Sequence, residues 1–241
     1  MTVWRLIPPF LASGAVHMAV DAWLLEQHIQ KSHPPTLRFY TWEPAAISLG
    51  YHQRQYPDHW NDLMWQGRSL DVVQRPTGGR AVLHQGDLTY AVITSGLSSN
   101  RMASYRQICE FLIQGWRSLG VELHYGSAER GYIHNPNCFG TATAADLIMS
   151  NGYKLIGSAQ KRCGNDILQH GSIRLNPDAD LFYQVFETDA VLPNLSFSRN
   201  QIEAESVMAA LINSAKTCFN ADFQMLPLSD TEWQQAVALS P

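Results

Sequence analysis

Arg75-Pro-Thr-Gly-Gly-Arg-Ala-Val-Leu-His84 is the most informative segment of this 241-residue chain, and it continues as Gln85-Gly-Asp-Leu-Thr-Tyr90. Adjacent glycines have no Cβ atoms, so their amide groups can approach a ligand closely, and the flanking arginines can meet negative charge. The segment lacks the Gly-x-x-x-x-Gly-Lys-Ser/Thr pattern of a P-loop and the Gly-x-Gly-x-x-Gly pattern of a dinucleotide-binding loop. The spacing of these residues alone fits a tight turn between residues 70–73 and 81–83 as well as it fits a ligand-binding loop.

Short β-rich segments occur in runs, and the expected helices stand apart from them. Strands are expected at residues 37–42, 72–73, 81–83, 88–93, 146–150 and 154–156. The dipeptide Asn151-Gly152 predicts a hairpin turn between the last two, which places Lys154 at the beginning of a strand. This arrangement favours an α+β fold, with a mixed, largely antiparallel sheet packed with helices, over a regular βαβ repeat.

Helices are predicted in four segments, at residues 16–30, 104–119, 201–218 and 230–238. The second has the clearest pattern, because Ser104 and Gln107 form a capping box and Gly120 can end the helix. Its apolar residues share one face: Ile108, Phe111, Leu112, Trp116 and Leu119. No linker, internal repeat or low-complexity tract divides the chain, so we expect residues 1–241 to form a single domain.

Composition and charge narrow the class of protein. An apolar fraction of 45% can fill a substantial core. A formal charge of −4 and an isoelectric point near 6.1 argue against a nucleic-acid-binding or membrane-surface protein, because those partners favour a basic excess. The sequence still leaves open a local basic patch, formed by Arg75, Arg80, Lys161 and Arg162.

The cysteines lie far apart, with no Cys-x-x-Cys pair to indicate a zinc or dithiol site, at positions Cys109, Cys138, Cys163 and Cys218. Scattered thiols suit a reducing cytosol. No uninterrupted apolar run approaches the ~18 residues that cross a bilayer, and residues 1–5 do not begin a signal peptide. We therefore expect a cytoplasmic protein with no metal site, no membrane partner and no nucleic-acid partner.

A series of motifs, in order along most of the chain, resembles the lipoate/octanoate protein-modifying family of the biotin/lipoate protein ligase superfamily. The motifs are His17-Met-Ala-Val-Asp21, residues 42–53, residues 75–90, Asn137-Cys-Phe139, residues 152–162 and Leu168-Gln-His-Gly-Ser-Ile173. The resemblance implies a biotin/lipoate protein ligase (BPL/LPL) catalytic domain. Two positions depart from the family pattern, since Ala22 and Asp146 stand where an acidic residue and a glutamate are usual.

Within this family, the chain resembles the cysteine-dependent octanoyltransferase subgroup more than the ATP-dependent lipoate ligases. Cys138, before Phe139, stands where that subgroup has its acyl-accepting cysteine. The resemblance implies an octanoyl-[acyl-carrier-protein]:protein N-octanoyltransferase that acts without a cofactor. Its donor would be octanoyl-acyl carrier protein. Its acceptor would be the lysine of a lipoyl carrier domain, as in the glycine cleavage H protein or a 2-oxoacid dehydrogenase subunit.

Two alternatives stay open. An ATP-dependent lipoate-protein ligase would use ATP and Mg²⁺, with the glycine loop and Lys154 around an acyl-adenylate. A non-catalytic protein would only hold acyl or lipoyl carrier domains. The resemblance implies that Cys138 and Lys154 are catalytic, with Lys154 stabilising the thiolate. From composition alone, a single cysteine is more often a buried apolar residue and a lone lysine a solvated strand residue.

The glycine loop and the segment after Lys154 are predicted to bind the substrate. The loop amides would donate hydrogen bonds to the acyl carbonyl oxygen, and small residues after Lys154 would leave room for the acyl chain. The predicted substrate-binding residues are Arg75, Thr77, Gly78, Gly79, Arg80, His84, Gly157, Ser158 and Ala159. Arg80 paired with a carboxylate and His84 as a hydrogen-bonded core residue are the alternatives, and His170 is interpreted as structural.

Overall fold

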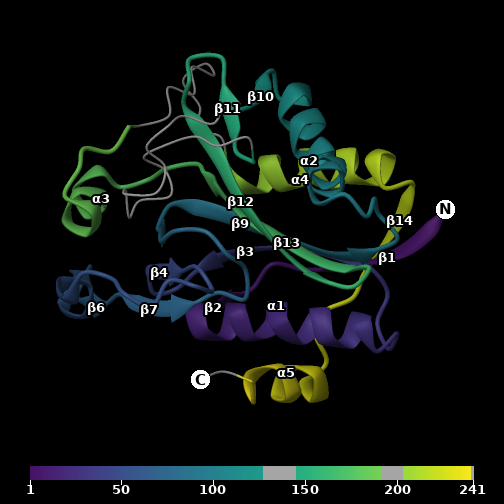
Figure 1. Cartoon of the computed structure of the whole chain (residues 1–241), viewed down its shortest axis with the longest axis horizontal. Coiled ribbons are helices and arrows are strands. Elements are labelled where there is room, and N and C mark those ends of the chain that lie inside the picture. Colours follow the sequence, from purple (N-terminus) through teal and green to yellow (C-terminus); the bar gives the residue numbers. More distant parts are fainter. Residues whose placement is uncertain (127–144, 192–202, 240–241) are drawn as a thin grey trace.

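The computed structural model describes residues 1–126, 145–191 and 203–239, and a mixed sheet runs through the centre of this part of the chain (Figure 1). Its strands are β1 (Thr2–Ile7), β2 (Leu11–Ala12), β3 (Thr36–Trp42), β9 (Asp87–Ser95), β10 (Leu123–Tyr125), β11 (Leu147–Met149), β12 (Lys154–Cys163), β13 (Asp166–Arg174) and β14 (Ala221–Met225). They are hydrogen-bonded in the order β10-β11-β12-β13-β9-β3-β1-β14, with β2 beside β3. Pairing is antiparallel from β10 to β3 and parallel from β3 to β14. The predicted largely antiparallel sheet is confirmed.

Helices α1 (Gly14–Ile29), α2 (Arg101–Ser118) and α4 (Ala204–Cys218) cover the two faces of this sheet, and α5 (Asp230–Val237) packs on α1. Helix α3 (Ala179–Phe186) and a short 3₁₀ helix at Asp58–Asp62 belong to a third cluster of buried apolar residues. Figure 1 shows α2 and α4 on one side of the sheet and α1 on the other, with α5 outside α1. Buried apolar side chains fill the space between the sheet and each layer of helices. In the described ranges, no helix is both long enough and apolar enough to cross a membrane.

Helix α2 begins earlier than the sequence predicts. Asn100 is its N-cap and accepts a hydrogen bond from the amide of Ala103, whereas Ser104 lies inside the helix and donates its hydroxyl to the carbonyl of Arg101. The predicted capping box at Ser104 is therefore wrong, because the side chain of Asn100, one turn upstream, accepts the hydrogen bond from a free amide of the first turn. The predicted apolar face is confirmed, since four of its members are fully buried: Ile108, Phe111, Leu112 and Trp116.

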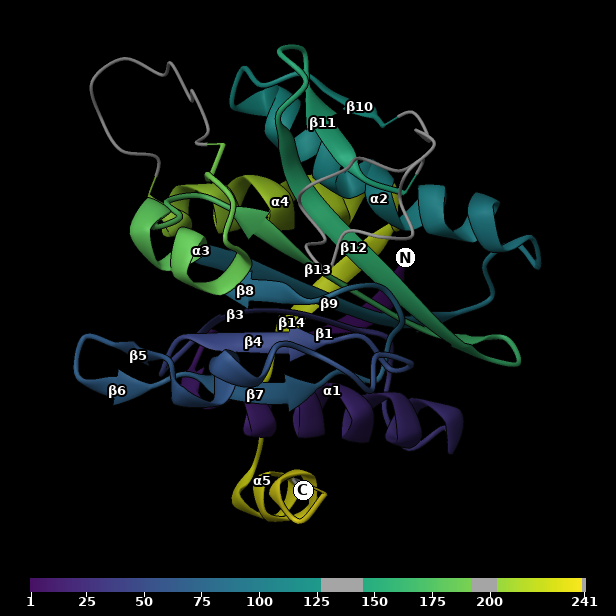
Figure 2. The ribbon, with the colours of Figure 1, turned by 60° about the vertical axis from the view of Figure 1, so that its left-hand side comes forward.

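A second, three-stranded sheet lies against α1 and the main sheet (Figure 2). It consists of β7 (Asp71–Gln74), β4 (Ala46–Leu49) and β8 (Val82–His84), with β4 in the middle, and a small hairpin of β5 (Met64–Trp65) and β6 (Arg68–Ser69) lies nearby in the chain. Because β7 and β8 each pair with β4 and not with each other, the glycine segment is not a tight turn between neighbouring strands. It crosses the end of β4, where a Cβ atom on Gly50 would lie 1.8 Å from the carbonyl oxygen of Gly79.

The predicted hairpin at Asn151-Gly152 is confirmed. Strands β11 and β12 are antiparallel, and Gly152 has a φ of +82°, a conformation that a residue without a Cβ adopts at low cost. Lys154 is the first residue of β12. The turn therefore places this lysine side chain at a defined point of the sheet.

Candidate functional site

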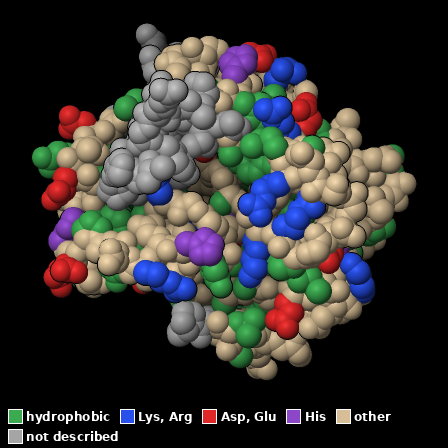
Figure 3. All heavy atoms as spheres, in the orientation of Figure 1, with side chains coloured by type: hydrophobic (Ala, Val, Ile, Leu, Met, Phe, Trp, Pro, Cys, Tyr) green, Lys and Arg blue, Asp and Glu red, His purple; other side chains and the backbone are tan. Residues whose placement is uncertain are grey.

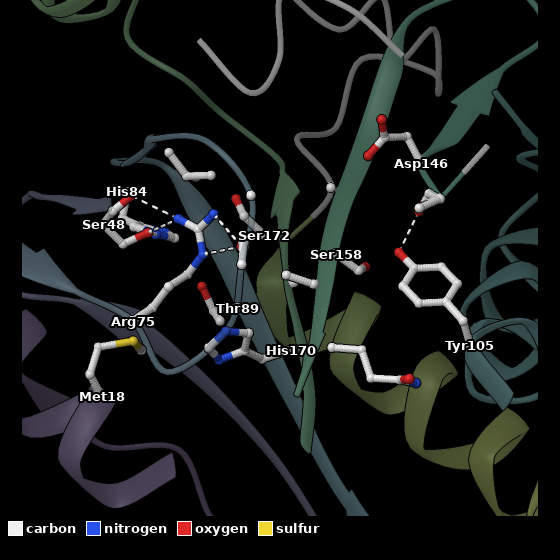
Figure 4. A pocket seen from close by; sticks show the side chains of 18 of the residues that line it. Met18, Ser48, Arg75, His84, Thr89, Tyr105, Asp146, Ser158, His170 and Ser172 are labelled. Carbon is white, nitrogen blue, oxygen red and sulfur yellow. Dashed lines mark hydrogen bonds between the residues drawn. The ribbon is translucent and has the colours of Figure 1, made fainter. Parts of the chain in front are cut away.

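A cavity of about 270 Å³ lies where the glycine segment meets β12, β13 and the beginning of α2 (Figure 4). Most of the predicted site residues line it: Arg75, Gly78, Gly79, His84, Lys154, Gly157, Ser158 and Ala159. Thr77 and Arg80 are not among the lining residues. Cys138 lies outside the residues that the structure describes. Residues distant in the sequence are thus brought together around one space.

Arg75 holds the glycine segment in its observed shape. Its guanidinium donates hydrogen bonds to the carbonyl oxygens of Ser48 at 2.8 Å, Gly78 at 2.8 Å and Arg80 at 2.7 Å. The side chain is buried, and Figure 4 shows it directed at Ser48. These contacts cross-link the loop to β4.

The two glycines of the loop border the cavity, and Gly79 has a φ of +100°. Within the described ranges, the N–H groups of Gly78 and Gly79 donate to no acceptor. A Cβ atom on Gly79 would also lie 2.7 Å from Nη2 of Arg75. The loop therefore needs glycine at this position for two reasons, and its amides can serve a ligand.

A buried chain of hydrogen bonds holds the other side of the loop. Thr77 Oγ1 lies 2.6 Å from His170 Nε2, and His170 Nδ1 lies 2.8 Å from Asp21 Oδ2. Tyr40 donates its hydroxyl to the same carboxylate at 2.8 Å, and Arg38 Nη1 lies 3.4 Å from Asp21 Oδ1. Burial alone would raise the pKa of Asp21, but Arg38, His170 and Tyr40 together hold it below its ordinary value.

The sequence did not predict most of these buried hydrogen bonds. His170 was interpreted as structural, yet it both lines the cavity and anchors Thr77. Asp21 was noted only as part of the opening motif. The position of Asp21 in the middle of an apolar helix, one turn after His17, is a signal that could have identified it. A carboxylate that is buried there needs polar partners, because burial without them is costly.

His84 satisfies both interpretations that the sequence left open. Its Nε2 lies 2.7 Å from Ser48 Oγ and its Nδ1 lies 2.8 Å from Asp87 Oδ2, so it is a hydrogen-bonded buried histidine. It also lines the cavity, and its ring stacks on Trp42 with ring centres 3.8 Å apart. Burial lowers the pKa of His84, despite the opposing effect of Asp87. Burial therefore favours the neutral form of the ring.

Lys154 forms an ion pair inside the molecule. Its Nζ lies 2.9 Å from Asp146 Oδ1, and both residues line the cavity. Asp146 stands at one of the positions where the sequence departs from the family pattern, and it still supplies a carboxylate. The pair consequently fixes the ammonium group beside the cavity.

The cavity reaches both faces of β12. Ser158 accepts a hydrogen bond from the Tyr90 hydroxyl on the face covered by α2, whereas Gly157 and Ala159 are in register with Ser172 and His170 and point to the other face. Figure 4 shows this division, with Tyr105 on one side of the strand and Met18, Ser48 and His84 on the other. In the part of the chain that is described, β11 pairs with β12 only as far as Ile156, so the next residues form an edge that the cavity can surround. Among all the residues that the structure describes, no group of three or more His, Cys, Asp or Glu side chains could hold a metal ion.

Comparison with known proteins identifies the family. The sequence profile of the Lipoyl protein ligase A/B catalytic domain matches residues 13–214. The chain belongs to this family. Relatives of the lipoyl protein ligase A/B family include Octanoyltransferase LipM of Bacillus subtilis, 39% identical over 194 residues, which covers 76% of this chain and 69% of the relative. The Kyrpidia tusciae Octanoyltransferase LipM is 35% identical over 230 residues, which covers 90% of this chain and 83% of the relative.

Solved structures of the lipoyl protein ligase A/B type have the same fold. A lipoate-protein ligase A bound with ATP superimposes with a TM-score of 0.79 at 22% identity, covering 99% of this chain and 94% of that one. The bipartite lipoate protein ligase of Thermoplasma acidophilum gives a TM-score of 0.74 at 20% identity, with coverages of 99% and 92%. At this level of identity the likeness concerns the fold. The predicted family and fold class are both confirmed.

Proposed function

We propose that this protein is an octanoyl-[acyl-carrier-protein]:protein N-octanoyltransferase, which moves octanoate to the lysine of a lipoyl carrier domain. Its similarity to several octanoyltransferases over most of their length carries the proposal. The cavity supports it, because an eight-carbon chain needs a slot shielded from water. Burying each CH₂ contributes about 0.8 kcal/mol, so a closed slot discriminates between chain lengths.

The proposed reaction has two steps, with Cys138 as the nucleophile. In the first, the thiolate attacks the carbonyl carbon of the octanoyl thioester, the carbon–sulfur bond to the donor breaks, and the donor thiol leaves with a proton from solvent. In the second, the ε-amine of the acceptor lysine attacks the cysteine thioester. An amide bond forms, the Cys138 thiolate is released, and the proton of the amine passes to water. Both steps start from a thioester, so the proposal needs no ATP, metal or other cofactor.

Lys154 is proposed to assist through its charge. A free cysteine has a pKa near 8.5, so a neighbouring cation is needed to raise the thiolate fraction at neutral pH. The ion pair with Asp146 holds the Lys154 ammonium group in one place beside the cavity. A positioned cation is more effective than one on a mobile surface side chain, because no free energy is lost in ordering it.

The amides of Gly78 and Gly79 are proposed to bind the carbonyl oxygen as it becomes negative. Both residues line the cavity, and within the ranges that the structure covers neither N–H group has a protein acceptor. Losing one such donor typically lowers the rate by about 10²- to 10³-fold. Arg75 and Thr77 keep this backbone in place through their own hydrogen bonds, so their proposed role in binding is indirect.

The proposed partners are octanoyl-acyl carrier protein as donor and, as acceptors, lipoyl domains of the glycine cleavage H protein or of 2-oxoacid dehydrogenase subunits. The bipartite lipoate protein ligase of Thermoplasma acidophilum, which has this fold, was studied with its E2 lipoyl domain, and this supports the proposed general class of acceptor. The free thiols of Cys109, Cys163 and Cys218 agree with a proposed cytoplasmic location, where thiols stay reduced.

The test uses the full-length protein, octanoyl-acyl carrier protein and no ATP. Intact-mass and peptide mass spectrometry should find one octanoyl group on Cys138, and adding a lipoyl domain should move it to the acceptor lysine. Cys138→Ala should abolish acylation, and Cys163→Ala should retain it. Modification that requires ATP and free lipoate, and that persists in Cys138→Ala, would replace this proposal with the lipoate-protein ligase.

A further inference from the structure

Four basic side chains lie on or next to the segments that border the cavity, and we call them the basic rim: Arg54, Arg101, Lys161 and Arg162. On one side, Arg101 is the first residue of α2 and lines the cavity. Arg162 is fixed next to it, because its Nη2 donates to the carbonyl of Ser98 at 2.7 Å and to Ser104 Oγ at 2.8 Å. This half of the rim therefore lies where β12 meets the beginning of α2.

The other half lies beside the glycine loop. Lys161 Nζ is 5.9 Å from the centre of the Tyr51 ring, and the Tyr51 amide donates to the carbonyl of Thr77 at 2.8 Å. Arg54 donates to Gln74 Oε1 at 3.1 Å, and Gln74 in turn donates to the carbonyl of Tyr51 at 3.1 Å. These contacts connect Arg54 and Lys161 to the loop that borders the cavity.

In the described part of the chain, the rim forms no ion pair with a carboxylate. The partners of its members are carbonyls, a hydroxyl, an amide and a ring. The protein as a whole carries a formal charge of −4, so the rim is a local exception. Figure 3 shows a group of Lys and Arg side chains near the middle of the face in view. The basic patch that the sequence left open contains Lys161 and Arg162, whereas Arg75 is buried in the loop.

The two protein substrates differ in the charge that they bring to this rim. A carrier protein holds an acyl group as a thioester on a phosphopantetheine arm, so a phosphodiester enters together with the acyl chain. The acceptor inserts a lysine side chain, which is a cation until it loses its proton. Arginine and lysine side chains attract the first group and repel the second. The rim is therefore complementary to the donor.

We propose that the basic rim docks the carrier protein that delivers the acyl thioester, through the phosphodiester of its arm and an acidic face around it. This inference rests on the proposed function. Complementary surface charges of this kind mainly raise the association rate, and salt weakens their effect. The rim thus gives a protein of net negative charge a favourable contact with an anionic substrate.

The experiment compares two donors with the same acyl group. One is octanoyl-acyl carrier protein and the other is octanoyl-pantetheine, a small thioester with no phosphate and no protein. Lys161→Glu and Arg54→Glu are the test variants, because neither side chain lines the cavity. Lys216→Glu, an exposed residue of α4, changes the net charge by the same amount and serves as the control.

Each test variant should raise KM for octanoyl-acyl carrier protein about three- to tenfold, and the salt dependence of that KM should become weaker. KM for octanoyl-pantetheine and for the lipoyl domain should stay within about twofold, as should all three values in Lys216→Glu. An unchanged carrier KM would overturn the docking proposal, and so would a rise in the lipoyl-domain KM instead. Transfer from octanoyl-pantetheine by the unaltered protein tests the proposed function separately, because that donor does not use the rim.

Discussion

Lys154 Nζ lies 2.9 Å from Asp146 Oδ1, and each of the two side chains is only 5% exposed. The residues are brought together by the hairpin turn between β11 and β12, so a local structural element creates a buried ion pair. Removing one partner of such a pair costs more free energy than the attraction of the two charges in water suggests, because the other charge stays buried without a partner. This relationship makes Asp146 a sensitive point for both stability and activity.

We expect Asp146→Asn to lower the free energy of unfolding by about 3 kcal/mol, because it removes the carboxylate from beside a buried ammonium group. Urea unfolding followed by circular dichroism measures this change. The Arg68–Glu43 pair is a suitable control, since its side chains are 64% and 54% exposed. Glu43→Gln should cost less than about 1 kcal/mol. Equal losses for the two variants would show that burial of the Lys154 pair contributes nothing.

Thr77→Val should lower stability by about 1–2 kcal/mol and reduce the transfer rate. The substitution keeps the volume but removes the hydroxyl that lies 2.6 Å from His170 Nε2, and a buried nitrogen then loses this partner. Thr77→Ser retains the hydroxyl and should restore most of both quantities. The measurements are thermal unfolding and kcat/KM for octanoyl transfer. A Thr77→Ser variant as impaired as Thr77→Val would argue against the hydrogen bond as the cause.

Gly50→Ala should displace the glycine loop. A Cβ atom at this position would lie 1.8 Å from the carbonyl oxygen of Gly79, which forces the two backbones apart. A shift of about 1 Å in a positioning group can cost about 10²-fold in rate, so kcat/KM should fall by this order. Gly78→Ala is the control for stability, because a Cβ atom there meets nothing within 4 Å. Full activity in Gly50→Ala would mean that the loop position does not matter for transfer.

The contact between β1 and the last helix should be sensitive to acid. Hydrogen bonds from Arg5 lower the pKa of Glu232 from 4.5 to about 2, and the carboxylate is 19% exposed. A carboxyl group with a lowered folded-state pKa stabilises the protein above its unfolded-state pKa and loses this effect as pH falls towards the folded-state value. Comparing unfolding free energies of the unaltered protein and Glu232→Gln should give a difference on the order of 2–3 kcal/mol at pH 6–7. Less than half should persist at about pH 3, and a difference independent of pH would contradict the assignment.

Cys109 should resist alkylation in the folded protein. Burial raises the pKa of its thiol to about 12, and the side chain is fully buried below Gln169, which donates to its sulfur at 3.4 Å. The thiol therefore stays protonated from pH 6 to 9 and is inaccessible. Iodoacetamide labelling followed by peptide mass spectrometry should modify Cys163, which is partly exposed, well before Cys109. Equal rates at the two cysteines would show that the core around α2 opens readily.

Local sequence patterns were sufficient for several elements. The spacing of apolar residues identified the buried face of α2, and Asn151-Gly152 identified the hairpin that positions Lys154. These features depend on backbone conformation and on periodicity within a few residues, so they can be recognised without knowledge of the rest of the chain. The predicted start of α2 was wrong because the sequence offers two possible N-cap residues about one turn apart, Asn100 and Ser104.

The roles of individual site residues were harder to predict from the sequence than these local elements. The pattern Arg-x-x-Gly-Gly-Arg predicted a loop with cations for a ligand, and it did not indicate that Arg75 also donates to carbonyl oxygens of its own loop and of β4. Which acceptors a guanidinium finds depends on the path of the loop across β4, and that path depends on the pairing of β4 with two strands distant in sequence. The partners of His170, which are Thr77 and Asp21, depend on tertiary packing in the same way.

The sequence by itself determined the family, the α+β class, the hairpin before Lys154 and the set of candidate residues, because these follow from motif order and short-range periodicity. Only the tertiary structure decided how those residues are connected. Asp21 and His170 are 149 positions apart, and their hydrogen bond forms because α1 packs against β13. A buried polar atom must find a partner, but the sheet register and helix packing decide which partner is within reach.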